Sequence, residues 1–232
     1  MKRIITLIAV LSAAAPLFAG DFTGTVTLKG TPPAEKEITP LKTDPSCGKL
    51  VTETPLTTHY VVGAKGELAN AIVIVKGVPG AKSTGASAAP VVVDQKACIY
   101  HPHIFAVQTG QKITVKNSDP VLHNVHTTPT VEGNKESNLA QMANGADLAL
   151  TFDKAEQFLR FKCDVHPWMF AYACVVDHPY YALTGADGTF KISGLPAGKY
   201  TVEVSHRKAG TVSQEVEITD AGGKADFTLE AK

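Results

Sequence analysis

The sequence predicts an all-β protein. Short runs in which apolar and polar residues alternate recur along the chain, and almost none of it has the period of an amphipathic helix. Turn residues separate these runs, as in Asp187-Gly188 and Pro196-Ala197-Gly198. Many short strands with regular turns are typical of β-sandwiches and Greek-key barrels. The expected strands are 22–28, 71–76, 104–108, 113–116, 148–152, 158–162, 172–176, 189–192, 199–204, 212–218 and 225–229.

The N-terminus has the pattern of a secretory signal peptide, which we place at residues 1–20. A basic start (1–3) precedes an apolar run (4–10) and small residues, and cleavage is expected after Ala19 or Gly20. The apolar run is too short to span a membrane, and no other stretch is long enough. We therefore expect an exported, periplasmic protein with no integral membrane segment in its mature chain.

Length and charge limit the possible functions. The 232 residues include 22 basic and 22 acidic side chains, and 44% of the residues are hydrophobic. A chain of this size can bury the core of one large domain or of two small ones. Because the charge is balanced and no basic cluster is present, we expect no nucleic-acid partner.

The seven residues from Cys163 to Met169 bring three metal-ligating side chains together. Cys163, His166 and Met169 are spaced three apart, and on a strand such residues point to opposite faces. Pro167 argues against a helix, so a tight loop is the structure in which all three reach one ion. A thiolate, an imidazole and a weak thioether, joined by a second His, are the ligands of a blue-copper electron-transfer site.

The second His is predicted at His123. The run 107–115, followed by Asn117 and by His123-Asn124-Val125, resembles the core of the cupredoxins. The loop 163–169 is most similar to that of amicyanin, with two residues between each pair of ligands and Pro after the His. This resemblance implies a cupredoxin-like Greek-key β-sandwich over residues 88–177.

The resemblance also implies a role for each residue. Copper would be held by His123, Cys163 and His166, with Met169 as a long axial ligand, and Asn124 would brace the Cys loop. Such a site changes little in geometry on electron transfer and leaves no open coordination position. We therefore expect a one-electron carrier with a redox partner protein, not an enzyme. Zinc is disfavoured because Met is a poor zinc ligand, and structural Cys and His without metal are the remaining alternative.

Four cysteines are present, and export permits a disulfide. If Cys163 binds metal, at most one disulfide forms among Cys47, Cys98 and Cys174. We favour Cys47 with Cys98, because both lie outside the metal loop and would tie the long N-terminal segment to the next region. A Cys163–Cys174 disulfide is the alternative that would remove the metal site.

A second domain is predicted around the first. Residues 184–202 resemble the hairpin of a carboxypeptidase regulatory-like domain, which is a transthyretin-like β-sandwich. Such a domain begins with a Gly-x-Val strand and then a strand of small residues and Val, and the chain supplies both far upstream, at 24–27 and 70–75.

We therefore expect the copper domain to be inserted in a loop of this second sandwich. Residues 77–87, rich in Gly, Ser and Ala, would form a linker or exposed loop. Three consecutive pieces are the alternative arrangement. The predicted domains are a signal peptide (1–20), a discontinuous carboxypeptidase regulatory-like sandwich (21–82 and 178–232) and the cupredoxin-like domain (88–177).

Several residues have no assigned role. His126 is expected at the surface or at an interface, with a second, weaker metal site as the alternative. Trp168 either packs at the barrel rim or forms an exposed apolar patch through which electrons pass to a partner. Met142 lies in 133–145, which we expect to be a long loop. The histidines that remain open are His101, His103, His178 and His206.

Three functions fit these observations. The first is an exported cupredoxin that transfers single electrons. The second is a periplasmic copper storage or delivery protein, and the third is a structural or interaction β-sandwich stabilised by a metal. The complete Cys-His-His-Met set favours the first over the second, because delivery sites are commonly exposed and rich in Met or His.

Overall fold

A computed structural model describes residues 19–232 of the chain. The predicted signal peptide lies almost entirely outside the described residues. Its last two residues, Ala19 and Gly20, pair with Pro196 and Leu195, so cleavage there would trim the start of a strand. Within 19–232, no helix is long and apolar enough to cross a membrane.

The described residues are almost entirely β-structure, as predicted. One short α-helix, α1 (Thr39–Thr43), and two 3-10 turns, η1 (Cys47–Lys49) and η2 (Gly85–Ser87), accompany the strands. The strands are β1 (Ala19–Lys29), β2 (Ile72–Lys76), β3 (Val91–Lys96), β4 (Ile99–His101), β5 (Ile104–Gln108), β6 (Ile113–Asn117), β7 (His123–Thr128), β8 (Ser137–Gln141), β9 (Leu148–Leu150), β10 (Glu156–Lys162), β11 (Phe170–Val176), β12 (Tyr181–Leu183), β13 (Thr189–Pro196), β14 (Gly198–His206), β15 (Gly210–Ile218), β16 (Gly223–Lys224) and β17 (Phe227–Glu230).

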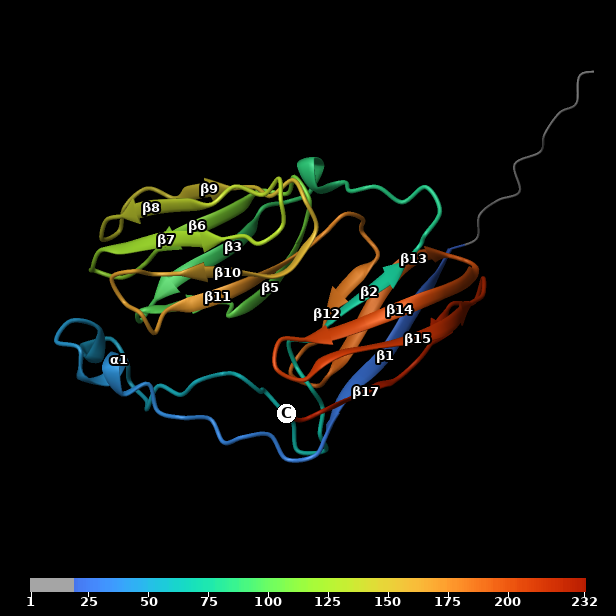
Figure 1. The fold of residues 1–232 in the computed structure, drawn as a ribbon, viewed down its shortest axis with the longest axis horizontal. Helices are drawn as coiled ribbons and strands as arrows, with labels where there is room; N and C mark the ends of the chain where they lie inside the picture. Colours follow the sequence, from blue (N-terminus) through green and yellow to red (C-terminus); the bar gives the residue numbers. More distant parts are fainter. Residues whose placement is uncertain (1–18) are drawn as a thin grey trace, which may run out of the picture.

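The strands form two sandwiches that lie side by side (Figure 1). In the middle sandwich, a sheet of order β5-β11-β10-β7-β8 faces a sheet of order β4-β3-β6-β9. In the flanking sandwich, β12-β2-β14-β15 faces β13-β1-β16, with β17 also paired to β1. Each has its own core, in which the alternate residues of the strands are buried, as in β1.

The flanking sandwich is built from both ends of the chain. β2 pairs with β12 and β14, and β1 pairs with β13 and β17. The chain therefore leaves this sandwich after β2, forms all the strands of the middle sandwich, and returns at β12. The domain limits given above stay a prediction.

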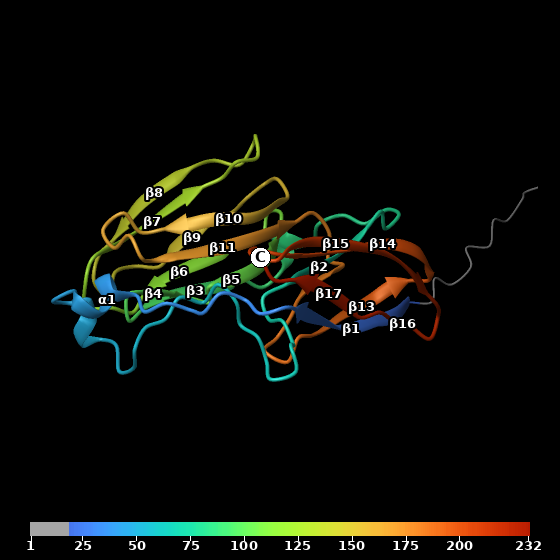
Figure 2. The same ribbon diagram turned by 60° about the horizontal axis from the view of Figure 1, so that its bottom comes forward.

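The segment between β1 and β2 differs from our expectation. We placed all of 21–82 in the flanking sandwich, but residues 30–59, here called the strap, run across to the middle sandwich and back (Figures 1 and 2). Leu41 and Cys47 are fully buried in the core of the middle sandwich. The strap has few alternating residues, so its local sequence did not indicate which core it joins.

The region 133–145 is also more regular than expected. Instead of one long loop, it contains strand β8, whose residues Ser137 to Gln141 pair with β7. β8 is at the sheet edge and three of its five residues are exposed. Because one face of an edge strand meets water and the other covers little core, the apolar alternation that marks a strand is missing.

The two sandwiches share a small apolar contact. Ile72 and Ile74 of β2 pack with Cys174 and Val176 of β11. Cys174 is a free, fully buried thiol, and burial raises its pKa to about 12. It is therefore a core residue and not a reactive thiol.

His206 makes the stability of the flanking sandwich depend on pH. Burial lowers its pKa to about 4, and its Nδ1 accepts hydrogen bonds from the backbone N–H groups of Lys208 and Ala209 at 3.3 and 3.2 Å. Between pH 4 and about 6.5 the unfolded chain binds a proton that the folded chain does not, so stability falls as the pH falls. We expect His206 to account for a loss of about 3 kcal/mol over this window.

Urea unfolding at pH 7.5 and at pH 4.5 measures this effect. His206→Asn keeps an acceptor but cannot take up the proton, so the loss between the two pH values should become smaller. His103, whose pKa burial also lowers to about 4, should keep part of the dependence in the variant. An unchanged difference between the two pH values would contradict the assignment to His206.

Candidate metal centre

The predicted ligands lie at one end of the middle sandwich, where two neighbouring strands meet a loop. His123 begins β7, and Cys163 directly follows β10, which pairs with β7. The loop 163–169 then curls back, because Cys163 N–H donates to Met169 O (3.1 Å) and Met169 N–H donates to His166 O (2.9 Å). The tight loop expected from the sequence is therefore present, with neither strand nor helix between Cys163 and Met169.

Three ligating atoms converge in this loop. His123 Nδ1 lies 2.9 Å from His166 Nδ1, and Cys163 Sγ lies 3.8 Å from His166 Nδ1. One potential metal-binding atom from each of the three residues, a ring nitrogen or the thiol sulfur, lies within 4.8 Å of the other two. Their exposure is 0%, 2% and 7% for His123, Cys163 and His166, and Met169 is fully buried in the same core. One buried ion can thus be reached from all three.

Asp119 orients His123, although no pattern in the sequence singled it out. Its Oδ2 accepts a hydrogen bond from His123 Nε2 at 2.9 Å. A carboxylate only accepts, so Nε2 carries the proton and Nδ1 keeps its lone pair for a metal. Asp119 also accepts from the backbone N–H groups of Ala97 (2.6 Å) and Cys98 (2.8 Å). It therefore fixes both the imidazole and the turn beside it.

These contacts shift the pKa values of both partners. Burial raises the pKa of Asp119, but the hydrogen bonds from His123 and from two backbone N–H groups outweigh it and leave the pKa below the usual value. Burial lowers the pKa of His123, but hydrogen bonds with Asp119 and Cys163 outweigh it and leave that pKa raised. The pair favours an ionised carboxylate beside the imidazole.

Asn124 contacts the Cys loop, as the sequence predicted. Its Oδ1 accepts from the backbone N–H groups of Asp164 (2.7 Å) and Val165 (3.3 Å) and lies 3.3 Å from Cys163 Sγ. Its Nδ2 donates to Asn138 Oδ1 at 2.6 Å. The first residues of the loop are therefore tied to β7 and, through Asn138, to β8.

The surroundings of Cys163 favour its thiolate. Burial raises the pKa of this thiol, but hydrogen bonds with His123 and with the backbone of Asn124, Val165 and His166 outweigh burial and leave the pKa below its usual value. A thiolate is the form that binds a metal. The loop thus lowers the free-energy cost of ionising Cys163 to the thiolate that binds a metal.

The structure contains the disulfide that we favoured from the sequence. Cys47 of the strap and Cys98 form a disulfide, while Cys163 and Cys174 are free, so the alternative Cys163–Cys174 disulfide is wrong. This disulfide lies next to His166: its two sulfur atoms and a ring nitrogen of His166 are all within 4.8 Å of one another. The strap is therefore anchored directly beside the candidate metal centre.

The middle sandwich matches a family of known proteins. Residues 88–176 match the model of the copper binding proteins of the plastocyanin/azurin family. These residues form a cupredoxin domain. Copper is accordingly the cofactor, and the cluster of His123, Cys163, His166 and Met169 resembles a type 1 copper site.

The comparison with solved structures finds copper proteins. A copper-containing nitrite reductase from Thermus scotoductus SA-01 is 19% identical, with a TM-score of 0.35 over 38% of this chain and 23% of that chain. The Cu(I) form of one amicyanin variant and the reduced Cu(I) form at pH 4 of another are each 24% identical, with TM-scores of 0.34 over 44% of this chain and 97% of those chains. No curated protein matches the chain.

His126 lies outside the metal cluster of the cupredoxin domain. Its Nδ1 contacts Asp164 Oδ2 and its Nε2 contacts Glu136 Oε1, each at 2.7 Å. Hydrogen bonds with Glu136 and Asp164 raise its pKa. Because the two carboxylates sit on opposite nitrogens of the ring, the group is an ion-pair bridge at the surface and does not converge on one ion. This favours the surface interpretation of His126.

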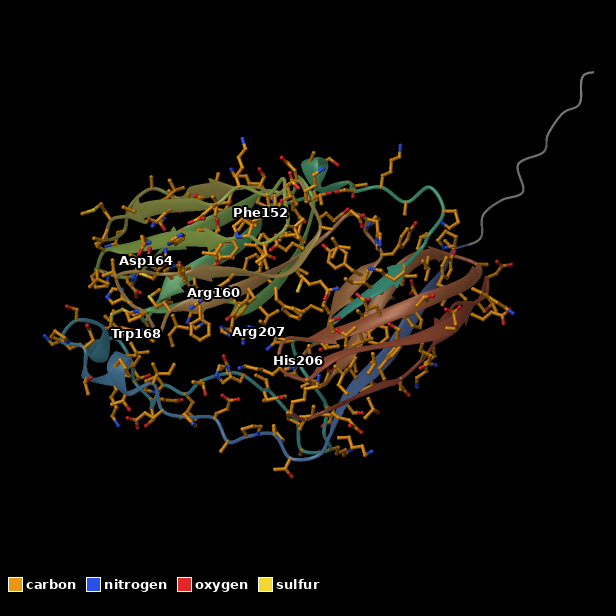
Figure 3. The ribbon with its side chains drawn as sticks, in the orientation of Figure 1. Phe152, Arg160, Asp164, Trp168, His206 and Arg207 are labelled. Atoms are coloured by element: carbon orange, nitrogen blue, oxygen red, sulfur yellow. A yellow bond between two sulfur atoms is a disulfide. The ribbon has the colours of Figure 1, made fainter. Side chains whose placement is uncertain are left out.

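Trp168 is half-buried between the cupredoxin domain and the strap (Figure 3). Its indole Nε1–H donates to Cys98 O at 3.1 Å, and its ring centroid lies 5.2 Å from that of His166. These contacts favour the packing interpretation at the domain rim. Met142, in contrast, is 66% exposed and is a loop residue, as expected.

Proposed function

We propose that the chain is an exported one-electron carrier whose mononuclear type 1 copper site is formed by His123, Cys163, His166 and Met169. The observation that carries the proposal is the buried convergence of two Nδ1 atoms and one Sγ atom at the end of a cupredoxin domain. When bound there, copper supplies one-electron chemistry through a thiolate, two imidazoles and a weak axial ligand.

The donor set fits copper. The Nδ1 atoms of His123 and His166 face each other at 2.9 Å, so both imidazoles present a donor nitrogen to the same point. The third donor is a thiol whose surroundings lower its pKa. A soft thiolate with two imidazoles and a thioether suits copper in both oxidation states better than it suits zinc.

The chain itself keeps these donors in place. Asp119 holds the imidazole of His123, and Asn124 holds the backbone that follows Cys163. The disulfide and the buried side chain of Leu41 fix the strap next to His166. A site fixed in this way changes little when the metal changes charge, which favours fast electron transfer.

The burial of the ligands supports transfer over storage or delivery. A delivery site has to release its ion to a partner, whereas here no ligand among His123, Cys163 and His166 is more than 7% exposed. We further propose that the protein is periplasmic, that it acts with a redox partner protein, and that 21–82 and 178–232 form a carboxypeptidase regulatory-like (transthyretin-like) sandwich. The strand pairing of β1 and β2 with the C-terminal strands supports the last of these.

A visible spectrum of the oxidised, copper-loaded protein tests the function. We expect an intense thiolate-to-copper charge-transfer band that Cys163→Ala abolishes completely. Cys174→Ala, which removes the other free thiol, should leave the band unchanged. A colourless protein that still binds copper would reject the type 1 site and favour storage or delivery, and a protein that binds no copper would favour a structural role.

A further inference from the structure

A cavity of about 450 Å³ lies beside the metal loop and is separate from the metal ligands. Pro167, Trp168 and Phe170 form one wall, Ile99 and Tyr100 a second, and strap residues, including Ile38 and Leu56, the third. Its lining is mostly apolar and contains three aromatic rings. Pockets of this volume and composition are the usual binding sites for small organic molecules.

Hydrogen bonds within the strap hold the strap wall of the cavity in place. Two arms of the strap pair through backbone hydrogen bonds from Ile38 N–H to Pro55 O and from Thr57 N–H to Lys36 O, both 2.8 Å. The Glu35 carboxylate binds the Thr57 hydroxyl and accepts from the backbone N–H groups of His59 (3.0 Å) and Tyr60 (2.7 Å). The disulfide at the far end of the strap also fixes its position.

The polar groups of the cavity select the charge of its ligand. No carboxylate, ammonium or guanidinium is among the described residues that line it, so a charged molecule would lose its hydration without gaining an ion pair. His103, which is half-buried in the wall, is neutral at pH 7 because burial lowers its pKa to about 4.

His103 also presents a hydrogen-bond acceptor. Its Nδ1 lies 3.0 Å from Phe170 O, and a carbonyl oxygen only accepts, so Nδ1 carries the proton of the neutral ring. Nε2 is then an unprotonated acceptor, and it makes no hydrogen bond within residues 19–232. A ligand that pairs with this nitrogen therefore donates an O–H or N–H hydrogen to it.

We propose that this cavity binds a small, flat, uncharged aromatic molecule that carries a phenolic hydroxyl, with the ring against Trp168 and the hydroxyl donated to His103 Nε2. The aromatic walls supply stacking faces, and the volume accepts one or two fused rings. Trp168 separates the cavity from the metal centre, because its ring also contacts that of His166. A bound ligand would thus lie one side chain from a copper ligand, although its binding does not need the metal.

Binding of 2-naphthol to the full-length mature chain tests the proposal, in the Cu(I) form and again without metal. Calorimetry should give one site with a Kd on the order of 100 µM. Trp168 is the only tryptophan, so the single indole N–H resonance should shift on titration. Absence of binding at millimolar probe, or binding without a shift of this resonance, would overturn the proposal.

Matched probes test the ligand class. Naphthalene, which lacks the hydroxyl, should bind at least fivefold more weakly than 2-naphthol, and 2-naphthalenesulfonate should not bind. His103→Phe should remove the difference between 2-naphthol and naphthalene. Equal affinity of the two neutral probes for the wild-type chain, or tight binding of the sulfonate, would contradict the assigned chemistry.

Matched variants test whether the ligand binds in this cavity. Leu56→Trp should fill the cavity from the strap side and weaken 2-naphthol binding at least tenfold. Val92→Trp is the control, because Val92 has nearly the same exposure (47% against 48%) but does not line the cavity. Because the metal-free arm does not depend on copper, a failure of the copper proposal would leave this result interpretable. Equal effects of the two substitutions would place the ligand elsewhere.

Discussion

Removal of the Cys47–Cys98 disulfide is expected to lower the free energy of unfolding by about 4 kcal/mol. The bond spans 51 residues, and closing a loop of this length restricts the unfolded chain by about that amount. Denaturant unfolding of the double variant Cys47→Ser/Cys98→Ser, compared with the wild-type chain, measures the change. A dithiol reductant should reproduce it in the wild-type chain and have no further effect on the variant.

The same change should loosen the cover of the metal centre. The disulfide anchors the strap beside His166, so without it the strap can separate from the loop 163–169. We expect a water-soluble chelator to remove copper from the variant at least tenfold faster, while the visible band of the bound metal persists because no ligand is changed. An unchanged removal rate would show that packing of Leu41 alone holds the strap.

The sequence was informative where chemistry requires a short spacing. Cys163, His166 and Met169 are seven residues from end to end, so local geometry alone implied a loop, and the loop is present. His123 was found because its neighbours resemble the cupredoxin core. The favoured disulfide is also present: Cys47 and Cys98 both lie outside the metal loop, and their bond ties the N-terminal segment to the next region.

The sequence was less informative where contacts between distant segments determine the structure. Asp119 stands in a turn next to Pro120, where an acidic residue is common for local reasons, so nothing marked it as the partner of His123. The strap contains one short helix and few apolar residues, and its path depends on a disulfide and on Leu41. The cavity exists only because the strap lies against the loop 163–169, and no local pattern encodes that.

Substitution of Asp119 is expected to damage both the stability of the protein and its copper binding. Asp119→Ala leaves the N–H groups of Ala97 and Cys98 and the ring N–H of His123 without their acceptor in a site where Asp119 is 2% exposed. Loss of a buried charged partner costs about 3–5 kcal/mol of stability. Because His123 also loses the group that fixes its tautomer, copper affinity should fall by about 10- to 100-fold.

Competition with a copper chelator and denaturant unfolding measure the two effects separately. Asp119→Asn keeps the shape and one acceptor oxygen, so it should retain part of the stability but still weaken copper binding, since the amide cannot serve all three donors. Asp153→Ala, which removes an exposed carboxylate from the turn before β10, is the control and should change neither quantity. If Asp119→Ala lost stability but bound copper normally, Asp119 would support the turn at Cys98 without orienting His123.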